Sequence, residues 1–467
     1  MEIQYRGNGK VFYKEKEYLC DLYYNENLGG VVININHMKN MASFLELPVE
    51  IKYLSGQLSN GFKFTLYKCI RTNTNDMLSY GKTVYTYEAE SLLCGIGGNE
   101  QNTPTFYLAE YTLSDIIEWG EITTYQVGDK YELIKHESPE IVIYEAENVK
   151  IVYTVRGSML PLVKTELLAE TIELQQHGVV GIEIKDEKTL DDFNVLFRKI
   201  KRLIEISSIR KVNIEKMEIY SKDIFDEYGK TIINRPIPVY GVLVKKQKKD
   251  RNKSAFRRYS WITLTELMTN DCFRIYFEKY ELLEPIIELF LETVYINSSN
   301  RRIFLNVVQA LETYHSRFIT NDLKEYKKRV DSIVKSTSKE LEESKRSFLL
   351  ANSKKFITLE SRLADLVLAE HNIYFDTGDI KLYDFPEVIA KTRNYYIHYD
   401  NRKKEKVLSE EELGWYNGIL FYILEYYILK ELGFSEGSKQ LREKLNERWG
   451  SVSQKLDIIK LSREMDN

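Results

Sequence analysis

The hydrophobic residues of this chain follow two different periods, one in each half, and this change limits the folds available to it. The front half contains short runs of β-branched and aromatic residues separated by polar or glycine-rich turns, at 11–13, 30–35, 62–67, 141–144 and 149–155. Many short strands at such spacing are typical of a β-sandwich. A stripe of apolar residues at helical spacing across 190–205 predicts one helix in this half. We therefore expect a β-rich, sandwich-like domain at the front.

The back half has apolar residues at the three- and four-residue spacing of amphipathic helices. Its candidate helices cover 278–295, 302–319, 324–348, 355–369, 386–399, 409–432 and 438–461. Ser409 and Glu412 have the spacing of a capping box, and Gly433 is placed to end the same helix. Consecutive helices without intervening strands predict a bundle. The chain is thus expected to be an α+β multidomain protein, with a β-rich domain followed by an all-α helical bundle.

We place the domain boundaries where the composition changes. Residues 1–225 form the expected β-rich N-terminal domain, 226–274 a connecting region, and 275–467 the helical domain. The connecting region contains a basic run: Lys245, Lys246, Lys248, Lys249, Arg251, Lys253, Arg257 and Arg258. Such a run can follow an RNA backbone, with Phe256 and Tyr259 stacking on bases. A solvated linker is the alternative, and the sequence leaves both open.

Charge and cysteine content narrow the class of protein. Residues 1–240 carry 27 basic and 35 acidic residues and residues 241–467 carry 39 and 35, so a polyanionic partner is expected to meet the back half. The four cysteines are far apart in the sequence, which predicts neither a disulfide framework nor a structural zinc site. The N-terminal residues lack an apolar signal segment, and the apolar stretch 418–429 is too short for a bilayer. We expect a cytoplasmic protein with no membrane partner.

One segment of the back half carries residues suited to chemistry on a phosphodiester: Arg393, Asn394 and His398. Arginine binds phosphate oxygens bidentately and stabilises negative charge, and histidine transfers protons near neutral pH. These groups need no metal and no cofactor. On a helix, Asn394 and His398 share a face, whereas Arg393 and His398 lie about 140° apart around the axis and about 7.5 Å apart along it. From spacing alone, a surface arginine and a partly buried histidine are an alternative.

The motif and its surroundings resemble a known family. RNxxxH at residues 393–398 is similar to the Rx4–6H motif of HEPN domains, which occur in metal-independent ribonucleases and their relatives. A short loop over 401–408 and a long apolar helix ending at Gly433 follow the motif. Upstream, residues 310–315 resemble the LExxH-like segment of ApeA-like HEPN domains. A β-rich front half with a terminal HEPN bundle is also similar to ApeA-like abortive-infection proteins.

The resemblance implies an anti-phage endoribonuclease that cleaves host RNA, with tRNA favoured, after a trigger such as a phage protein is sensed. It implies a sensor or regulatory role for residues 1–225, and no metal and no cofactor. HEPN domains typically pair in a homodimer or higher homo-oligomer so that two motifs form one composite site. Their reaction uses the ribose 2′-OH as nucleophile and leaves a 2′,3′-cyclic phosphate. By this resemblance His398 moves the proton, Arg393 holds the scissile phosphate, and Asn394 orients His398 or the phosphate.

Two questions stay open at the level of the sequence. Glu312 and His315, three residues apart on a helix, either line the same site or form a polar pair on the helix surface. The chain is alternatively a catalytically silent HEPN protein that binds nucleic acid or acts as a scaffold, with a ligand-binding β-sandwich. Substitution of Arg393 or His398 separates the two functions, because only the enzyme requires both side chains.

Overall fold

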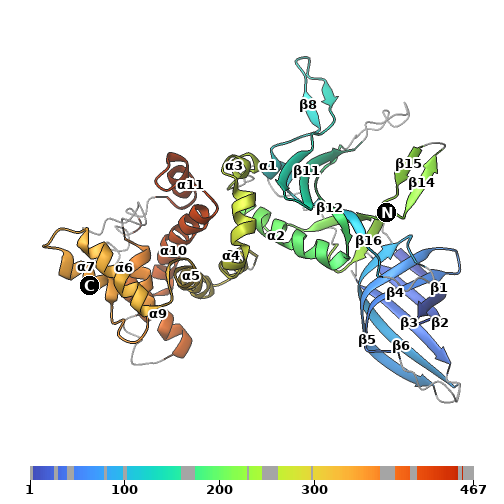
Figure 1. Cartoon of the computed structure of the whole chain (residues 1–467), viewed down its shortest axis with the longest axis horizontal. Helices are drawn as coiled ribbons and strands as arrows, with labels where there is room; N and C mark the ends of the chain where they lie inside the picture. Colours follow the sequence, from blue (N-terminus) through green and yellow to red (C-terminus); the bar gives the residue numbers. More distant parts are fainter. Residues whose placement is uncertain are drawn as a thin grey trace. The chain divides into compact units, whose positions relative to one another are not determined.

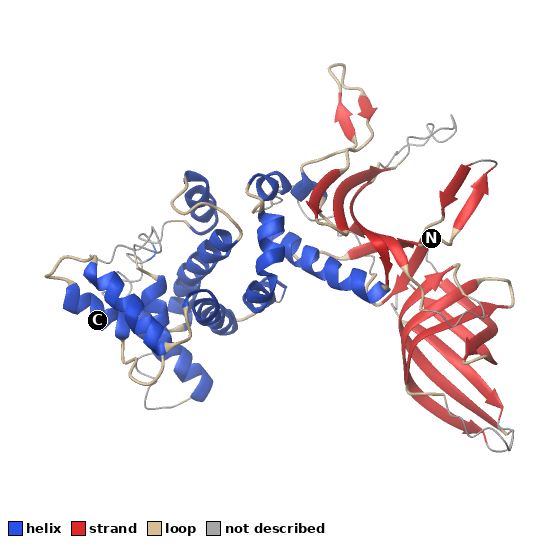
Figure 2. Cartoon of the chain, viewed as in Figure 1, coloured by secondary structure: helices blue, strands red, loops and turns tan. Residues whose placement is uncertain are grey.

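The computed structural model describes residues 4–25, 30–38, 47–77, 81–97, 103–158, 174–228, 231–244, 261–295, 298–368, 384–399, 407–450 and 455. The chain divides into two compact units: unit 1 comprises residues 1–204 and 212–265, and unit 2 comprises 205–211 and 266–467. Figure 1 follows the chain from its blue N-terminal strands to its red C-terminal helices. Figure 2 shows that unit 1 consists mainly of strands and unit 2 of helices. The expected fold class, a β-rich front half followed by a helical back half, is confirmed.

The first six strands of unit 1 form an antiparallel sheet that closes on itself. They are β1 (Gln4–Tyr13), β2 (Lys16–Asn25), β3 (Val31–Met38), β4 (Glu50–Leu58), β5 (Lys63–Met77) and β6 (Lys82–Cys94). Their spatial order is β6-β3-β2-β1-β4-β5, and β5 pairs back to β6. Along β2, Tyr18, Cys20, Leu22 and Tyr24 are buried and the residues between them are more exposed. This alternation gives the closed sheet its apolar interior.

Strand β6 also continues into an open sheet, because its two ends have different neighbours. Residues 82–89 pair with β3, whereas residues 91–93 pair with β16 (Ile237–Gly241). Gly241 is required at this junction, since a Cβ there would lie 2.2 Å from the carbonyl oxygen of Glu90. The order continues through β13 (Ile214–Tyr220), β7 (Phe106–Leu113), β12 (Gln176–Lys188), β11 (Val149–Gly157) and β10 (Ile141–Glu145). The strands form one continuous sheet instead of the two facing layers of a sandwich.

The sheet shows that the first part of the expected connecting region, 226–274, belongs to the β-rich unit. β16 is a central strand, and the hairpin of β14 (Phe225–Tyr228) and β15 (Thr231–Asn234) precedes it. Residues 226–228 and 231–244 therefore fold within unit 1, although their short strands give little periodic signal in the sequence. The basic run from Lys245 to Arg258, with Phe256 and Tyr259, lies outside the described residues.

Helix α2 (Leu190–Ser208) extends the predicted 190–205 helix and packs against the sheet in unit 1. The Phe197 ring stacks on Tyr111 of β7 with 3.7 Å between centroids. In its first turn, Asp191 accepts a hydrogen bond from Tyr67 and pairs with Lys68 at 3.1 Å. Burial opposes ionisation of this carboxyl, but its hydrogen-bonded partners outweigh burial and lower the pKa of Asp191 to about 2. Unit 1 also contains α1 (Ile117–Gly120) and the hairpin of β8 (Tyr125–Val127) and β9 (Leu133–Lys135).

The longest buried helix segment of the back half lies in α10 (Glu410–Glu431), which is buried along most of its length. The others are α3 (Leu264–Thr269), α4 (Cys272–Tyr295), α5 (Asn300–Tyr314), the π-helix η3 (His315–Ile319), α6 (Leu323–Lys335), α7 (Glu342–Leu350), α8 (Leu359–Leu366), α9 (Asp384–His398) and α11 (Lys439–Trp449). Of these, α4, α5 and α11 contact α10. The predicted capping box is present, with Ser409 accepting from the backbone N–H of Glu412. Gly433 follows α10 with φ of +101°, which suits glycine. None of the described helices is long and apolar enough to cross a membrane.

The structure divides one predicted helix into two. Residues 324–348 were expected to be continuous, whereas α6 ends at Lys335 and α7 begins at Glu342. The side chains of Ser336 and Thr337 both donate to the carbonyl oxygen of Ile333. Such local side-chain hydrogen bonds compete with the helical backbone ladder, which explains the break.

Candidate active site

The buried face of α9 determines how the motif residues are presented. Phe385, Ile389, Thr392 and Tyr396 recur every three or four residues and are buried. Phe385 stacks on Tyr416 of α10 with 5.6 Å between ring centroids. This stripe fixes α9 against the bundle and turns the remaining positions, including the motif, towards its flanks and outer face.

Two hydrogen bonds also fix the C-terminal half of α9 to the segment that precedes α10. Thr392 Oγ1 accepts from the backbone N–H of Leu408 at 3.3 Å, and Tyr396 Oη donates to the carbonyl oxygen of Leu408 at 3.4 Å. The Tyr396 ring meets Phe304 of α5 edge-on, with 6.4 Å between centroids. The backbone that carries the motif is therefore held from two sides.

The guanidinium of Arg393 has two side-chain partners. Its Nη2 donates to Oε2 of Glu312 on α5 at 3.2 Å, and its Nη1 donates to Oδ1 of Asn394 at 3.2 Å. The side chains of Arg393 and Glu312 retain about a third of their exposure, 28% and 33%. A guanidinium has five N–H donors, so these two bonds leave donors for a phosphate. Glu312 and Asn394 thus orient Arg393 without blocking it.

His398 lies in the last turn of α9 and is exposed. It makes no hydrogen bond or ion pair with any residue that the structure describes. Because α9 is a continuous helix, the five-residue spacing keeps His398 about 140° around the axis from Arg393. Asn394 bonds Arg393 and not His398. Among the described residues, Arg393 and His398 therefore neither contact each other nor share a partner.

His315, the other histidine considered for the site, is fully buried. Its Nε2 lies 3.0 Å from Oδ2 of Asp365, and its Nδ1 lies 3.0 Å from Nη1 of Arg362. Arginine only donates hydrogen bonds, so Nδ1 must accept and Nε2 must carry the proton. Burial lowers the pKa of His315, which favours this neutral form. The structure therefore brings Glu312 to Arg393 but does not place His315 beside it.

The partners of His315 form a buried charge network that the sequence analysis missed. Arg329 donates from Nε and Nη2 to the two oxygens of Asp365, at 3.0 and 3.3 Å. Arg362 also donates to Asn321 at 2.6 Å. Arg362 and Asp365 are three residues apart on α8, a spacing that was the only signal in the sequence. The network holds His315, the first residue of the π-helix that follows α5, three residues after the Glu312 that binds Arg393.

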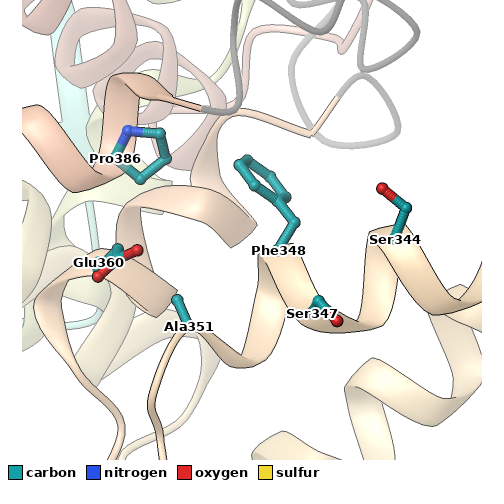
Figure 3. Close-up of a pocket in the computed structure, with 6 residues that line it drawn as sticks. All are labelled: Ser344, Ser347, Phe348, Ala351, Glu360 and Pro386. Carbon is teal, nitrogen blue, oxygen red and sulfur yellow. The ribbon is translucent and has the colours of Figure 1, made fainter.

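A cavity of about 270 Å³ lies at the opposite end of α9 from His398. Figure 3 shows the residues around it, which come from α7, the start of α8 and the first turn of α9: Ser344, Ser347, Phe348, Ala351, Glu360 and Pro386. Burial, and secondarily the charge of Glu387, raises the pKa of Glu360. Pro386 precedes His398 by twelve residues, which is about 18 Å along a helix. The cavity is therefore separate from the motif.

A second arginine near the motif was also missed. Arg301, in the first turn of α5, donates from Nη1 to the hydroxyl of Tyr399 at 3.3 Å. Its guanidinium lies 4.6 Å from the centre of the Tyr396 ring. Both tyrosines flank His398 in the sequence, so a second cation is fixed at the motif end of α9.

Comparison with known proteins identifies both halves. The family described as Apea-like HEPN matches residues 305–438, which include most of α5 and the motif on α9. The family described as ApeA N-terminal domain 1 matches residues 4–270, more than half of the chain. No curated protein and no solved structure matches the chain.

Proposed function

Because the chain belongs to the ApeA N-terminal domain 1 family and carries an Apea-like HEPN domain, we propose that it is an anti-phage abortive-infection endoribonuclease. HEPN domains are commonly ribonucleases. The observation that carries the proposal is the oriented Arg393 on the same helix as the exposed His398. The substrate is host RNA, with tRNA favoured, and unit 1 receives the phage-derived trigger.

The motif side chains supply a base and a phosphate-binding cation for a transesterification of RNA without a metal ion. A base, His398, removes the proton of the ribose 2′-OH, whose oxygen attacks the adjacent phosphorus. Arg393 holds the non-bridging oxygens and stabilises the charge that develops on them. The bond from phosphorus to the 5′-oxygen breaks, and that oxygen takes a proton as it leaves. The products are a 2′,3′-cyclic phosphate and a free 5′-hydroxyl.

The separation of Arg393 and His398 on one helix supports a site made by two chains. In a homodimer, the histidine of one copy meets the phosphate that the arginine of the other copy holds. This histidine takes the proton of the 2′-OH, and solvent supplies the proton that the leaving 5′-oxygen takes. Glu312 is a positioning residue in this scheme, because its carboxylate holds Arg393 in one orientation.

RNA cleavage in the presence of EDTA tests the activity. Wild-type protein is incubated with total bacterial tRNA and with a structureless RNA, alone and with lysate from phage-infected cells. We expect discrete fragments with 2′,3′-cyclic phosphate ends, and none from Arg393→Ala or His398→Ala protein that remains folded. Equal cleavage by wild type and His398→Ala would refute the assigned role, and no cleavage under either condition would favour a silent binding protein.

Mixed dimers test the composite site. Arg393→Ala and His398→Ala chains with different affinity tags are expressed together, and the heterodimer is purified through both tags. We expect the heterodimer to regain cleavage, because it contains one intact arginine and one intact histidine on different chains. An inactive heterodimer between two folded chains would show that each active unit needs both residues on one chain.

A further inference from the structure

Arg301 lies at the N-terminal end of α5 and contacts the tyrosines beside the motif. We infer that Arg301 binds a phosphate of the RNA strand next to the scissile one, with the exposed Tyr399 beside it as a surface for a base. The inference rests on the proposed ribonuclease function and extends it to a second substrate contact. Neither residue belongs to the RNxxxH motif.

The charge of Arg301 is not neutralised by a neighbouring acid. Its contacts are the hydroxyl of Tyr399, 3.3 Å from Nη1, and the face of the Tyr396 ring, 4.6 Å from the guanidinium carbon. No carboxylate among the described residues pairs with it. Arg393, by contrast, shares its charge with Glu312. Arg301 is therefore oriented by aromatic groups and keeps its full charge for an anion.

The position of Arg301 does not follow from the stability of its own helix. It lies in the first turn of α5, where the helix dipole favours acidic residues and disfavours cations. The first turn of α5 contains no acidic residue. A function outside the helix explains a cation at this place better than helix stability does. The competing structural role is support of the C-terminal end of α9, whose dipole attracts a cation.

The exposed ring of Tyr399 is suited to stacking on a base of flexible single-stranded RNA. Tyr399 is 56% exposed and directly follows His398. Ile397, two residues earlier, is 47% exposed. A ring next to an arginine offers stacking for a base and a counter-charge for its phosphate, the combination used by proteins that bind single-stranded nucleic acid. The surface leads from His398 towards α5, so it would hold the strand that flanks the cleaved bond.

Salt-dependent binding separates a phosphate contact from structural support. The probe is a fluorescein-labelled 20-nucleotide unstructured RNA of mixed sequence, and all full-length proteins carry His398→Ala so that the probe stays intact. Arg301→Met keeps a long apolar stem but removes the charge, and Arg301→Lys restores the charge. Arg302→Met is the matched control, because Arg302 is an exposed arginine at the next position of the same helix.

We expect Arg301→Met to raise the dissociation constant about fivefold at 0.1 M salt, since an exposed charge pair contributes up to ~1 kcal/mol. The slope of log K against log salt should become shallower by about 0.7, the value for one phosphate contact on a single strand. Arg301→Lys should restore both quantities, and Arg302→Met should change neither. An unchanged slope in Arg301→Met, or an equal effect of Arg302→Met, would overturn the inference. Failure of the parent protein to bind the probe would overturn it as well, and absence of cleavage by wild type would show separately that the proposed function fails.

Discussion

Glu425 makes the stability of the helical bundle depend on pH near neutrality. Its side chain on α10 is fully buried, with Oε1 accepting from Arg448 Nε at 2.9 Å and Oε2 accepting from Trp449 Nε1 at 2.6 Å. The Trp449 ring stacks on Phe421, with 5.0 Å between centroids. Burial raises the pKa of Glu425 to about 7 from an ordinary value of 4.5, against the opposing effect of Arg448.

The direction of the effect follows from proton binding. The folded chain holds this proton more tightly than the unfolded chain, so the stabilising contribution is complete below pH 4.5 and is lost as the pH rises through about 7. The difference between 4.5 and about 7, at about 1.4 kcal/mol per pH unit, amounts to about 3 kcal/mol. Glu425→Gln removes the titrating group. It also leaves one donor of Arg448 or Trp449 facing an amide, so the variant is less stable but its profile is flatter.

Denaturant unfolding at a series of pH values between 4.5 and 8 measures this difference. Helical ellipticity reports the unfolding of the helical bundle. The two units need not unfold in one transition, so only the difference in free energy of unfolding between wild type and variant is compared at each pH. Titration of His315 is common to both proteins and cancels. Glu443→Gln, at an exposed glutamate of α11, is the matched control for removal of a carboxylate. Parallel profiles for wild type and Glu425→Gln would refute the reasoning.

Three further predictions concern the site and its supports. Glu312→Gln should lower kcat/KM for RNA about tenfold through kcat, because Arg393 loses its positioning partner, and should change the free energy of unfolding by less than about 1 kcal/mol; a change in KM alone would contradict a positioning role. His315→Ala should destabilise the fold by about 3 kcal/mol, because it leaves buried groups of Asp365 and Arg362 without a partner, and a loss below about 1 kcal/mol in denaturant unfolding would contradict the buried network. Phe197→Ala should destabilise unit 1 by about 3–5 kcal/mol in the same assay, because it removes a buried ring stacked on Tyr111, and a loss below about 1 kcal/mol would contradict that packing.

The sequence predicts the helices of unit 2 well because their apolar stripes are local. The stripe through Phe385, Thr392 and Tyr396 has the spacing that α9 uses to pack, so the motif was assigned to the correct helix. The break between α6 and α7 had a local signal as well, in Ser336 and Thr337, which donate to a backbone carbonyl. That signal was outweighed by the charged helical pattern on either side of it.

The sheet could not be predicted to the same extent, because strand order is not a local property. The closure of the first six strands depends on β5 pairing with β6, and the open sheet begins where β6 meets β16, about 150 residues later in the chain. Gly241 marks this junction only after the approach of the Glu90 carbonyl is known. Composition therefore identified β structure but not the continuous sheet.

In the candidate site, too, the spacing of neighbouring residues was predictable from the sequence, whereas contacts between distant residues were not. Glu312 and His315 are three residues apart, about 60° around a regular helix, and were considered together. Their partners show that the two side chains have different roles. Glu312 pairs with Arg393 of α9, whereas Arg362 and Asp365 of α8 hold His315 in the core. Both sets of partners are more than forty residues away in the chain, so spacing alone could not separate the roles of the two side chains.

The charge balance around the motif explains how a paired arginine can still attract RNA. Arg329 pairs with Asp365 and Arg393 pairs with Glu312, whereas Arg362 donates to His315 and Asn321 instead of a carboxylate. The histidine between them contributes no charge, because Arg362 holds its Nδ1 as an acceptor. The three guanidinium groups are therefore accompanied by two carboxylates. The cluster keeps one excess positive charge, so the ion pair orients the arginine while the field around it still favours a phosphate.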